Sequence, residues 1–171
     1  TNIKYVKTDE KGKVDLEDLE NLIKKNKNSI VSLMHGNNEI GNINNLKQLS
    51  KVCEQHRVIL HSDTVQTVGH YPINLNEIEI HGIVGSAHKF HGPKGIGLLY
   101  LNNKHKISPF IHGGAQERNM WGGTENVYGI VGLSEALSLA SEEMEDHKTK
   151  ILSLKKHMIS SLKNKIKGVR F

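Results

Sequence analysis

A lysine between an apolar run and a rigid turn is the residue of this sequence best suited to covalent chemistry. In the stretch 84–97, a short apolar run leads to Ser86, His88 and Lys89, and a Gly-Pro-Lys-Gly turn follows before a second apolar run. A lysine in such a place can form a Schiff base with a carbonyl cofactor. The same pattern is typical of a strand, a loop and a strand with a solvated lysine, so this stretch alone leaves both interpretations open.

Two further polar clusters follow apolar runs in the same way. Asn37 and Asn38 come after the run 29–34, and Asp63 and Gln66 come after the next short run. Each residue could have a purely structural role, since Asp63 could cap a turn and Gln66 could bond the backbone. Asn37 is the member of its pair that we expect to be structural.

The elements that must position these clusters alternate between strands and helices. Asp15 is the expected N-cap of a helix with apolar residues at helical spacing, and Leu46 to Cys53 make the apolar stripe of a second helix. The expected strands are 3–7, 29–34, 58–60, 80–84 and 96–101. This alternation indicates the α/β class with a mostly parallel sheet, and the compact run 29–34 is typical of a buried parallel strand.

That order of elements carries a functional argument. In open α/β sheets, ligands bind at the carboxyl ends of the strands, where all three polar clusters lie. If the strands are neighbours, a carboxylate, an amide pair, a hydroxyl, an imidazole and a lysine converge on one crevice. These groups suit an aromatic phosphate cofactor, because the carboxylate can pair with a pyridinium nitrogen and the lysine can bond covalently. His88 could equally be an ordinary surface histidine, so the convergence carries the hypothesis.

Composition argues against two classes of partner. The net charge is +5, but the lysines are dispersed and aromatic residues make up 5%, so we expect no nucleic-acid binding. No run approaches the roughly 20 apolar residues of a membrane span, so we expect no membrane partner. The single cysteine, Cys53, fits a reducing compartment and hence the cytoplasm. Its place on a helical apolar stripe is typical of a buried cysteine that packs as a small hydrophobe.

The last third of the chain combines a glycine-rich loop with a long helical pattern. The loop 112–126 has no apolar periodicity, and its Gly-Gly-Thr124 segment could bind an anion ahead of a helix. Trp121 is either a core anchor or an interface residue. The pattern from 127 to 166 is longer than a typical globular helix. We therefore expect residues 1–145 to be part of one domain, and 146–171 to be a helix and the start of a second, truncated domain.

Taken together, the motifs resemble those of cysteine desulfurases of the NifS/IscS type, in the class V aminotransferase family of pyridoxal phosphate enzymes. The segments that carry the resemblance are MHGNNEIG (34–41), HSDTVQ (61–66), SAHK with GPKGIG (86–97), and GGAQER with GTEN (113–126). They stand in the order and at the spacing of that family. The resemblance implies the large domain of the fold type I pyridoxal-phosphate transferases, with the long helix leading to a smaller C-terminal domain.

The resemblance also implies a role for each site residue. Lys89 would carry pyridoxal 5'-phosphate covalently and move protons at the substrate. Asp63 would pair with the ring nitrogen, Gln66 with the ring hydroxyl oxygen, and Asn38 would approach the same side of the ring. Ser86 and His88 would contact the phosphate. Thr124 would reach the phosphate bound to the other subunit, which makes the expected functional unit a homodimer.

The implied activity is conversion of L-cysteine to L-alanine, with the sulfur taken as a persulfide and passed to an Fe–S scaffold protein or another acceptor. The resemblance places the nucleophilic cysteine, the substrate-binding arginine, and the N-terminal phosphate loop with its stacking histidine outside these 171 residues. We therefore expect this chain alone to be inactive. Alternatives are a related class V enzyme, either a selenocysteine lyase or an aminotransferase, and a non-catalytic binding or dimerisation fragment.

Overall fold

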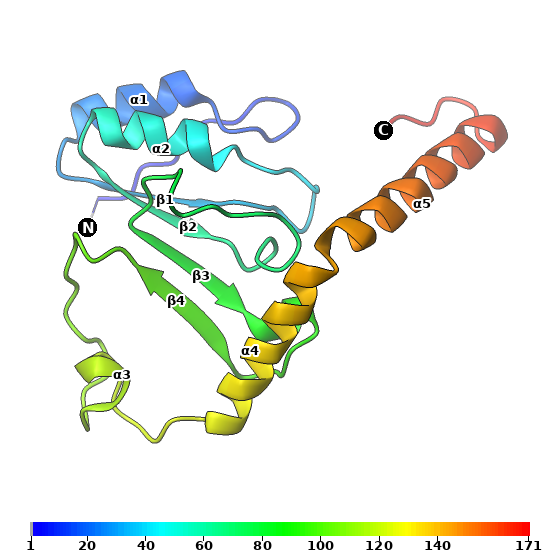
Figure 1. Ribbon diagram of the computed structural model, residues 1–171. Helices are drawn as coiled ribbons and strands as arrows, with labels where there is room; N and C mark the ends of the chain where they lie inside the picture. Colours follow the sequence, from blue (N-terminus) through cyan, green and yellow to red (C-terminus); the bar gives the residue numbers. More distant parts are fainter. Residues whose placement is uncertain (1) are drawn as a thin grey trace.

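The computed structural model describes residues 2–171 and contains a four-stranded sheet with helices packed against it (Figure 1). The strands are β1 (Ile30–Met34), β2 (Ile59–Asp63), β3 (Gly82–Ser86) and β4 (Gly97–Leu101). The helices are α1 (Leu16–Lys25), α2 (Leu46–Gln55), the short 3₁₀ turn η1 (Ala87–Phe90), α3 (Gln116–Asn119), α4 (Val127–Glu142) and α5 (Met144–Lys165). The expected α/β class is confirmed.

The sheet order is β1-β2-β3-β4, with two parallel pairs and one antiparallel pair. Met34 pairs with Asp63, and Asp63 pairs with Val84, so the three parallel strands end at one edge. β4 returns antiparallel from that edge, where Gly97 pairs with Ser86. Gly97 is required at this point, because a Cβ there would lie 2.6 Å from the carbonyl oxygen of Gly85.

Two separate apolar clusters hold the elements together. Beneath α1 and α2, which lie side by side (Figure 1), the larger cluster includes Leu49, Leu60 and Ile83. The smaller one joins η1 to α4 and contains Val68, Ala87, Phe90 and Ala140. The second cluster fixes the segment that carries Lys89, so the packing of α4 bears directly on the site.

Local signals in the sequence explain where the first two helices begin. The Asp15 carboxylate accepts hydrogen bonds from the backbone N–H groups of Glu17 and Asp18, as expected for an N-cap. The Asn45 side chain caps α2 in the same way, through the N–H of Gln48. The apolar stripe of α2 is buried, and Cys53 on it is fully buried.

Two expectations about strands are wrong. Residues 3–7 form no strand, and Ile3 and Tyr5 are 67% and 86% exposed, because no neighbouring strand among the described residues pairs with this segment. β1 is parallel as expected but not fully buried, since Ile30 is 67% exposed. As the outer strand of this sheet, β1 has one edge that no other described strand covers.

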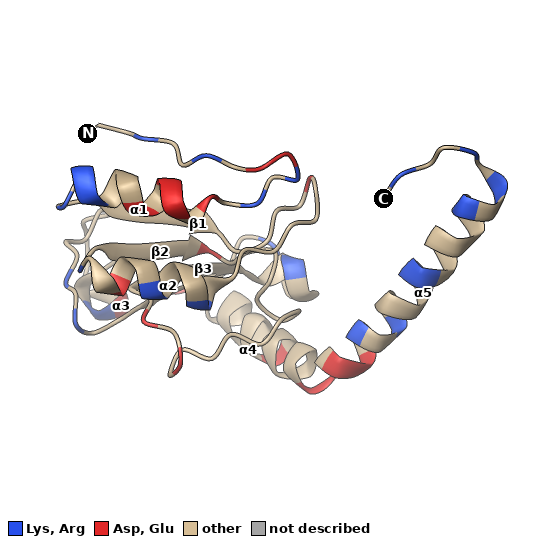
Figure 2. Cartoon of the chain, turned by 90° about the horizontal axis from the view of Figure 1, so that it is seen from above, with Lys and Arg blue, Asp and Glu red and all other residues tan. Residues whose placement is uncertain are grey.

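Near its C-terminus the chain leaves the sheet. The helical pattern of 127–166 divides at Glu143 into α4 and α5, and α5 extends away from the body (Figure 1). Lysines are spread along α5, with acidic residues at its start (Figure 2). No side chain of α5 is buried among the described residues. Within residues 2–171, no helix is long and apolar enough to cross a bilayer.

Candidate active site

The parallel strands bring two of the predicted site residues onto one face of the sheet. Side chains alternate between the faces of a strand, and directly paired residues share a face. Asp63 pairs with Val84, and Ser86 lies two residues further along β3, so Asp63 and Ser86 share a face. Leu60 of the α1–α2 cluster points to the opposite face. The two strand ends are therefore neighbours, as expected, and the grouping of their clusters into one site stays a prediction.

Asp63 is held in place by the turn that follows β2. Its Oδ1 accepts the backbone N–H of Val65 at 2.9 Å. The Thr64 hydroxyl and backbone N–H both donate to the Val84 carbonyl, at 2.7 and 3.1 Å, which ties this turn to β3. Oδ2 of Asp63 has no hydrogen-bond partner among the described residues, so it can accept a hydrogen bond from a ligand.

Lys89 lies on the single 3₁₀ turn η1, directly after β3. Ala87 and Phe90 are three residues apart, so they share one side of the turn, and both are buried. His88 is exposed and Lys89 half-buried, because they occupy the remaining positions of the turn. The turn is closed by the Gly92 N–H, which donates to the Ala87 carbonyl at 2.8 Å.

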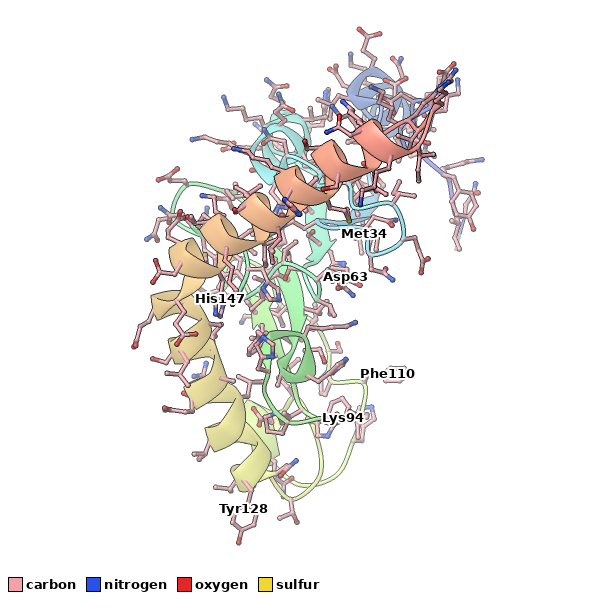
Figure 3. All side chains as sticks on the ribbon, turned by 90° about the vertical axis from the view of Figure 1, so that its right-hand side faces the viewer. Met34, Asp63, Lys94, Phe110, Tyr128 and His147 are labelled. Atoms are coloured by element: carbon pink, nitrogen blue, oxygen red, sulfur yellow. The ribbon has the colours of Figure 1, made fainter. Side chains whose placement is uncertain are left out.

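Ser86 and His88 form a polar pair beside the lysine. The Ser86 Oγ and His88 Nδ1 atoms are 2.8 Å apart, within hydrogen-bond distance. The alternative lysine, Lys94, belongs to the Gly-Pro-Lys-Gly turn and is drawn well apart from Asp63 in Figure 3. The position of Lys89 on η1, three residues after the end of β3, therefore favours Lys89 over Lys94.

The two asparagines in the loop after β1 make different contacts. The Asn37 Oδ1 accepts the N–H groups of Glu39 and Ile40 at 2.8 and 3.1 Å, so Asn37 shapes the loop as predicted. Asn38 is exposed, and its amide donates to the Glu39 carboxylate. Gly36 allows the close packing of this loop on the Asp63 turn, because a Cβ there would lie 2.6 Å from Thr67 Cγ2.

The remaining predicted residues are less closely joined to this cluster. Gln66 is half-buried in the Asp63 turn, near Gly36. Thr124 is exposed in the loop before α4, and no hydrogen bond among the described residues joins it to the other site residues. Trp121 in the same loop is 55% exposed, so it does not anchor the core that the described residues form. The structure thus places Asp63, Ser86 and Lys89 at or just after neighbouring strand ends, while the roles of all the predicted site residues stay predictions.

Sequence reasoning missed two histidines near the site. His35 is 8% exposed, and its Nδ1 lies 2.9 Å from the hydroxyl of Thr67, which itself donates to the Thr64 carbonyl. Nδ1 of His35 is therefore the donor, and burial lowers the pKa of this imidazole. His70 contacts the Lys89 backbone. His35 belongs to the segment 34–41 noted above, but neither histidine's contact could be read from it, because the partners Thr67 and Lys89 are 32 and 19 residues away in the sequence.

The residues present fit pyridoxal phosphate. The set provides a carboxylate oxygen for a ring N–H, a hydroxyl and an imidazole for a phosphate, and a lysine for the aldehyde. Asp63 and Ser86 share one face of adjacent strands, with Lys89 three residues beyond Ser86. The side chains that pyridoxal phosphate requires therefore lie at the carboxyl edge of the sheet, which is the edge where α/β proteins bind ligands.

Comparison with known proteins identifies the family. The pattern that defines the class V aminotransferases ("Aminotransferase class-V") matches residues 1–171, and the chain belongs to this family. It is 42% identical over 167 residues to a cysteine desulfurase IscS of Dictyoglomus turgidum, covering 98% of this chain and 42% of that protein. An IscS cysteine desulfurase of Clostridium botulinum strain Hall is 40% identical over 168 residues, again with 98% and 42% coverage.

Solved structures agree with the fold. A NifS-like protein superimposes with a TM-score of 0.89 and 40% identity, covering 94% of this chain and 44% of its own. A NifS-like protein from Rickettsia africae gives 0.91 and 33%, with 95% and 46% coverage. The expected resemblance, fold and cofactor are confirmed at the level of the family. The chain spans 42% of the length of the two curated relatives named above.

Pyridoxal phosphate, when bound, supplies an electron sink for the electrons of a broken bond at the substrate α-carbon. The Asp63 carboxylate can hold the proton on the ring nitrogen, which keeps that sink strong. Ser86 and His88 can hold the phosphate and so orient the ring. The Lys89 amine would hold the group through its aldehyde and would be the proton carrier of the site.

Cys53 is expected to be chemically inert in the folded protein. It is fully buried on α2, and this burial raises the pKa of its thiol to about 11. Because the thiolate is the reactive form, alkylation of folded protein at about pH 8 should be at least about 100-fold slower than alkylation in denaturant. Mass spectrometry after timed quenching measures both rates, and comparable rates would contradict the burial.

Proposed function

We propose that the protein of which this chain is part is a cysteine desulfurase. The reaction breaks the C–S bond of L-cysteine, forms an S–S bond on an enzyme thiolate, and releases L-alanine. The observation that carries the proposal is the grouping of Asp63, Ser86, His88 and Lys89 at one strand edge, in a chain 42% identical to an IscS cysteine desulfurase.

We propose that the thiolate that accepts the sulfur lies outside these 171 residues. Cys53 is the single cysteine of the sequence and is buried on α2 with a raised pKa. A neutral thiol enclosed in the core cannot attack the substrate sulfur. We therefore propose that this chain supplies most of the cofactor site, and that it is inactive without the rest of the protein.

We further propose that residues 1–145 are part of the cofactor-binding domain and that 146–171 begin a smaller domain. This division is supported by the packing of α4 on η1, through Ala140 and Phe90. It is also supported by α5, which extends from the body with its apolar side chains Ile151, Leu154 and Met158 more than half exposed. Such exposure is typical of a helix that another part of a protein covers.

A homodimer is the assembly that we propose, with Thr124 contacting the phosphate bound to the partner subunit. The loop that carries Thr124 contains Trp121, which is 55% exposed, and is flanked by Phe110 at 92% and Tyr128 at 93% exposure. Phe110 and Tyr128 both project outward in Figure 3. We place the protein in the cytoplasm, with an Fe–S scaffold protein or another sulfur acceptor as its partner.

The function is tested with the full-length protein, pyridoxal phosphate, L-cysteine and a reducing thiol. Alanine and sulfide should appear in equal amounts, because each turnover releases one of each under reduction. L-Selenocysteine in a parallel assay separates a selenocysteine lyase from a cysteine desulfurase. The absence of alanine and sulfide from cysteine would reject the proposed function.

A further inference from the structure

The backbone of Lys89 is held by a histidine from a different element. His70 lies in the turn after β2, and its Nε2 is 2.8 Å from the carbonyl oxygen of Lys89. A carbonyl oxygen can only accept, so Nε2 of His70 must carry the proton and donate. Among the hydrogen bonds of the described residues, His70 is the partner of this carbonyl.

Gly69, next to His70, allows the turn after β2 to pack closely on η1, the turn that carries Lys89 (the lysine turn). Gly69 has φ +80°, and a Cβ there would lie 2.7 Å from the Phe90 Cβ and 3.3 Å from that of Ala140. A side chain at position 69 would therefore push the turn after β2 away from η1. Val68 and Phe90 belong to the same buried cluster, so apolar packing and the His70 bond draw the two segments together.

The opposite side of the lysine turn is already fixed. Gly92 packs closely on Ala87 and on Ala136 of α4, where a Cβ would approach their Cβ atoms to 2.9 and 3.2 Å. The Gly92 N–H bonds the Ala87 carbonyl, which closes η1. These contacts hold the ends of the turn, whereas the His70 bond is made to the lysine residue itself.

We propose that His70 is a positioning residue for Lys89. Its imidazole N–H fixes the peptide group from which the Lys89 side chain departs, and thereby the direction in which the amine reaches the bound cofactor. This inference rests on the proposed function of Lys89. A small displacement of a reacting group lowers a rate strongly, so the effect falls on catalysis more than on substrate binding.

The test compares His70→Leu with His70→Gln in the full-length protein. Leucine keeps much of the volume and removes the donor, whereas the glutamine amide can donate from nearly the same position. His157→Leu is the control, since His157 lies on α5, which extends away from the body that carries η1 (Figure 1), and makes no hydrogen bond to another described side chain. Hydrogen–deuterium exchange of the peptide spanning 87–92 is measured first, without a requirement for activity.

For His70→Leu we expect exchange in 87–92 to rise about threefold to tenfold, as for loss of one hydrogen bond. The kcat for alanine formation should fall about tenfold with KM unchanged, and His70→Gln should restore most of both values. Unchanged exchange and kcat in His70→Leu would overturn the inference, as would an exchange increase spread over the whole chain. A wild-type protein without cysteine desulfurase activity would instead reject the proposed function, while the exchange data would still report whether His70 holds the turn.

Discussion

Replacing Lys89 by alanine in the full-length protein is expected to abolish its visible absorption and to lower alanine formation by about 10³-fold or more. In the proposed site, the Lys89 amine would bond the cofactor aldehyde and would also carry a proton to or from the substrate. Alanine removes both roles without disturbing the packing of η1, since Ala87 and Phe90 make its buried contacts. Absorbance spectra and alanine assays on purified protein measure the two effects.

Lys94→Ala is the matched control for this prediction. Lys94 is exposed in the neighbouring turn and makes no salt bridge with another described residue, so both readouts should stay within about twofold of wild type. If Lys94→Ala were colourless and Lys89→Ala retained the visible band, the assignment of the lysine would be wrong.

Asp63→Asn is expected to lower kcat about 10²- to 10³-fold, with the fold intact. The amide oxygen can still accept the Val65 N–H, which preserves the turn, but a neutral amide cannot hold a proton on the ring nitrogen. The loss is that of a preorganised charge next to the reacting group. Steady-state kinetics measure the rate, and circular dichroism measures the fold.

Two control variants complete this experiment, a conservative substitution at position 63 and a substitution at a distant aspartate. Asp63→Glu keeps the charge but moves it by one methylene, so part of the rate should return. Asp146→Asn, at an exposed position in the first turn of α5, should leave the rate unchanged. An Asp63→Asn protein with a rate within about threefold of wild type would show that Asp63 has no electrostatic role.

The sequence predicted the elements that nearby residues encode. Asp15 and the apolar spacing behind it specified α1, because an N-cap and a helical stripe act within a few residues. The stretch around Lys89 similarly predicted a strand, a turn and a returning strand. The segment 3–7 failed because alternation alone does not make a strand, which also needs a paired neighbour.

In the candidate site, too, local signals were predictable from the sequence and long-range contacts were not. Asp63, Ser86 and Lys89 were predictable, since each follows a strand end and parallel strands end at one edge. The hydrogen bond from His70 to the Lys89 carbonyl spans 19 residues and depends on the close approach of Gly69 to Phe90. No local pattern encodes such a contact, because the chain must fold before the two segments meet.

By itself, then, the sequence determined which lysine follows the strand end and which family of motifs surrounds it. The tertiary structure decided that Asp63 and Ser86 share a face, that Cys53 is enclosed beneath α2, and that His70 holds the lysine turn. The physical reason is the separation in sequence over which each interaction acts. Capping, periodicity and turn chemistry act along the chain, whereas register, burial and long-range hydrogen bonds exist only after the sheet and its helices have packed.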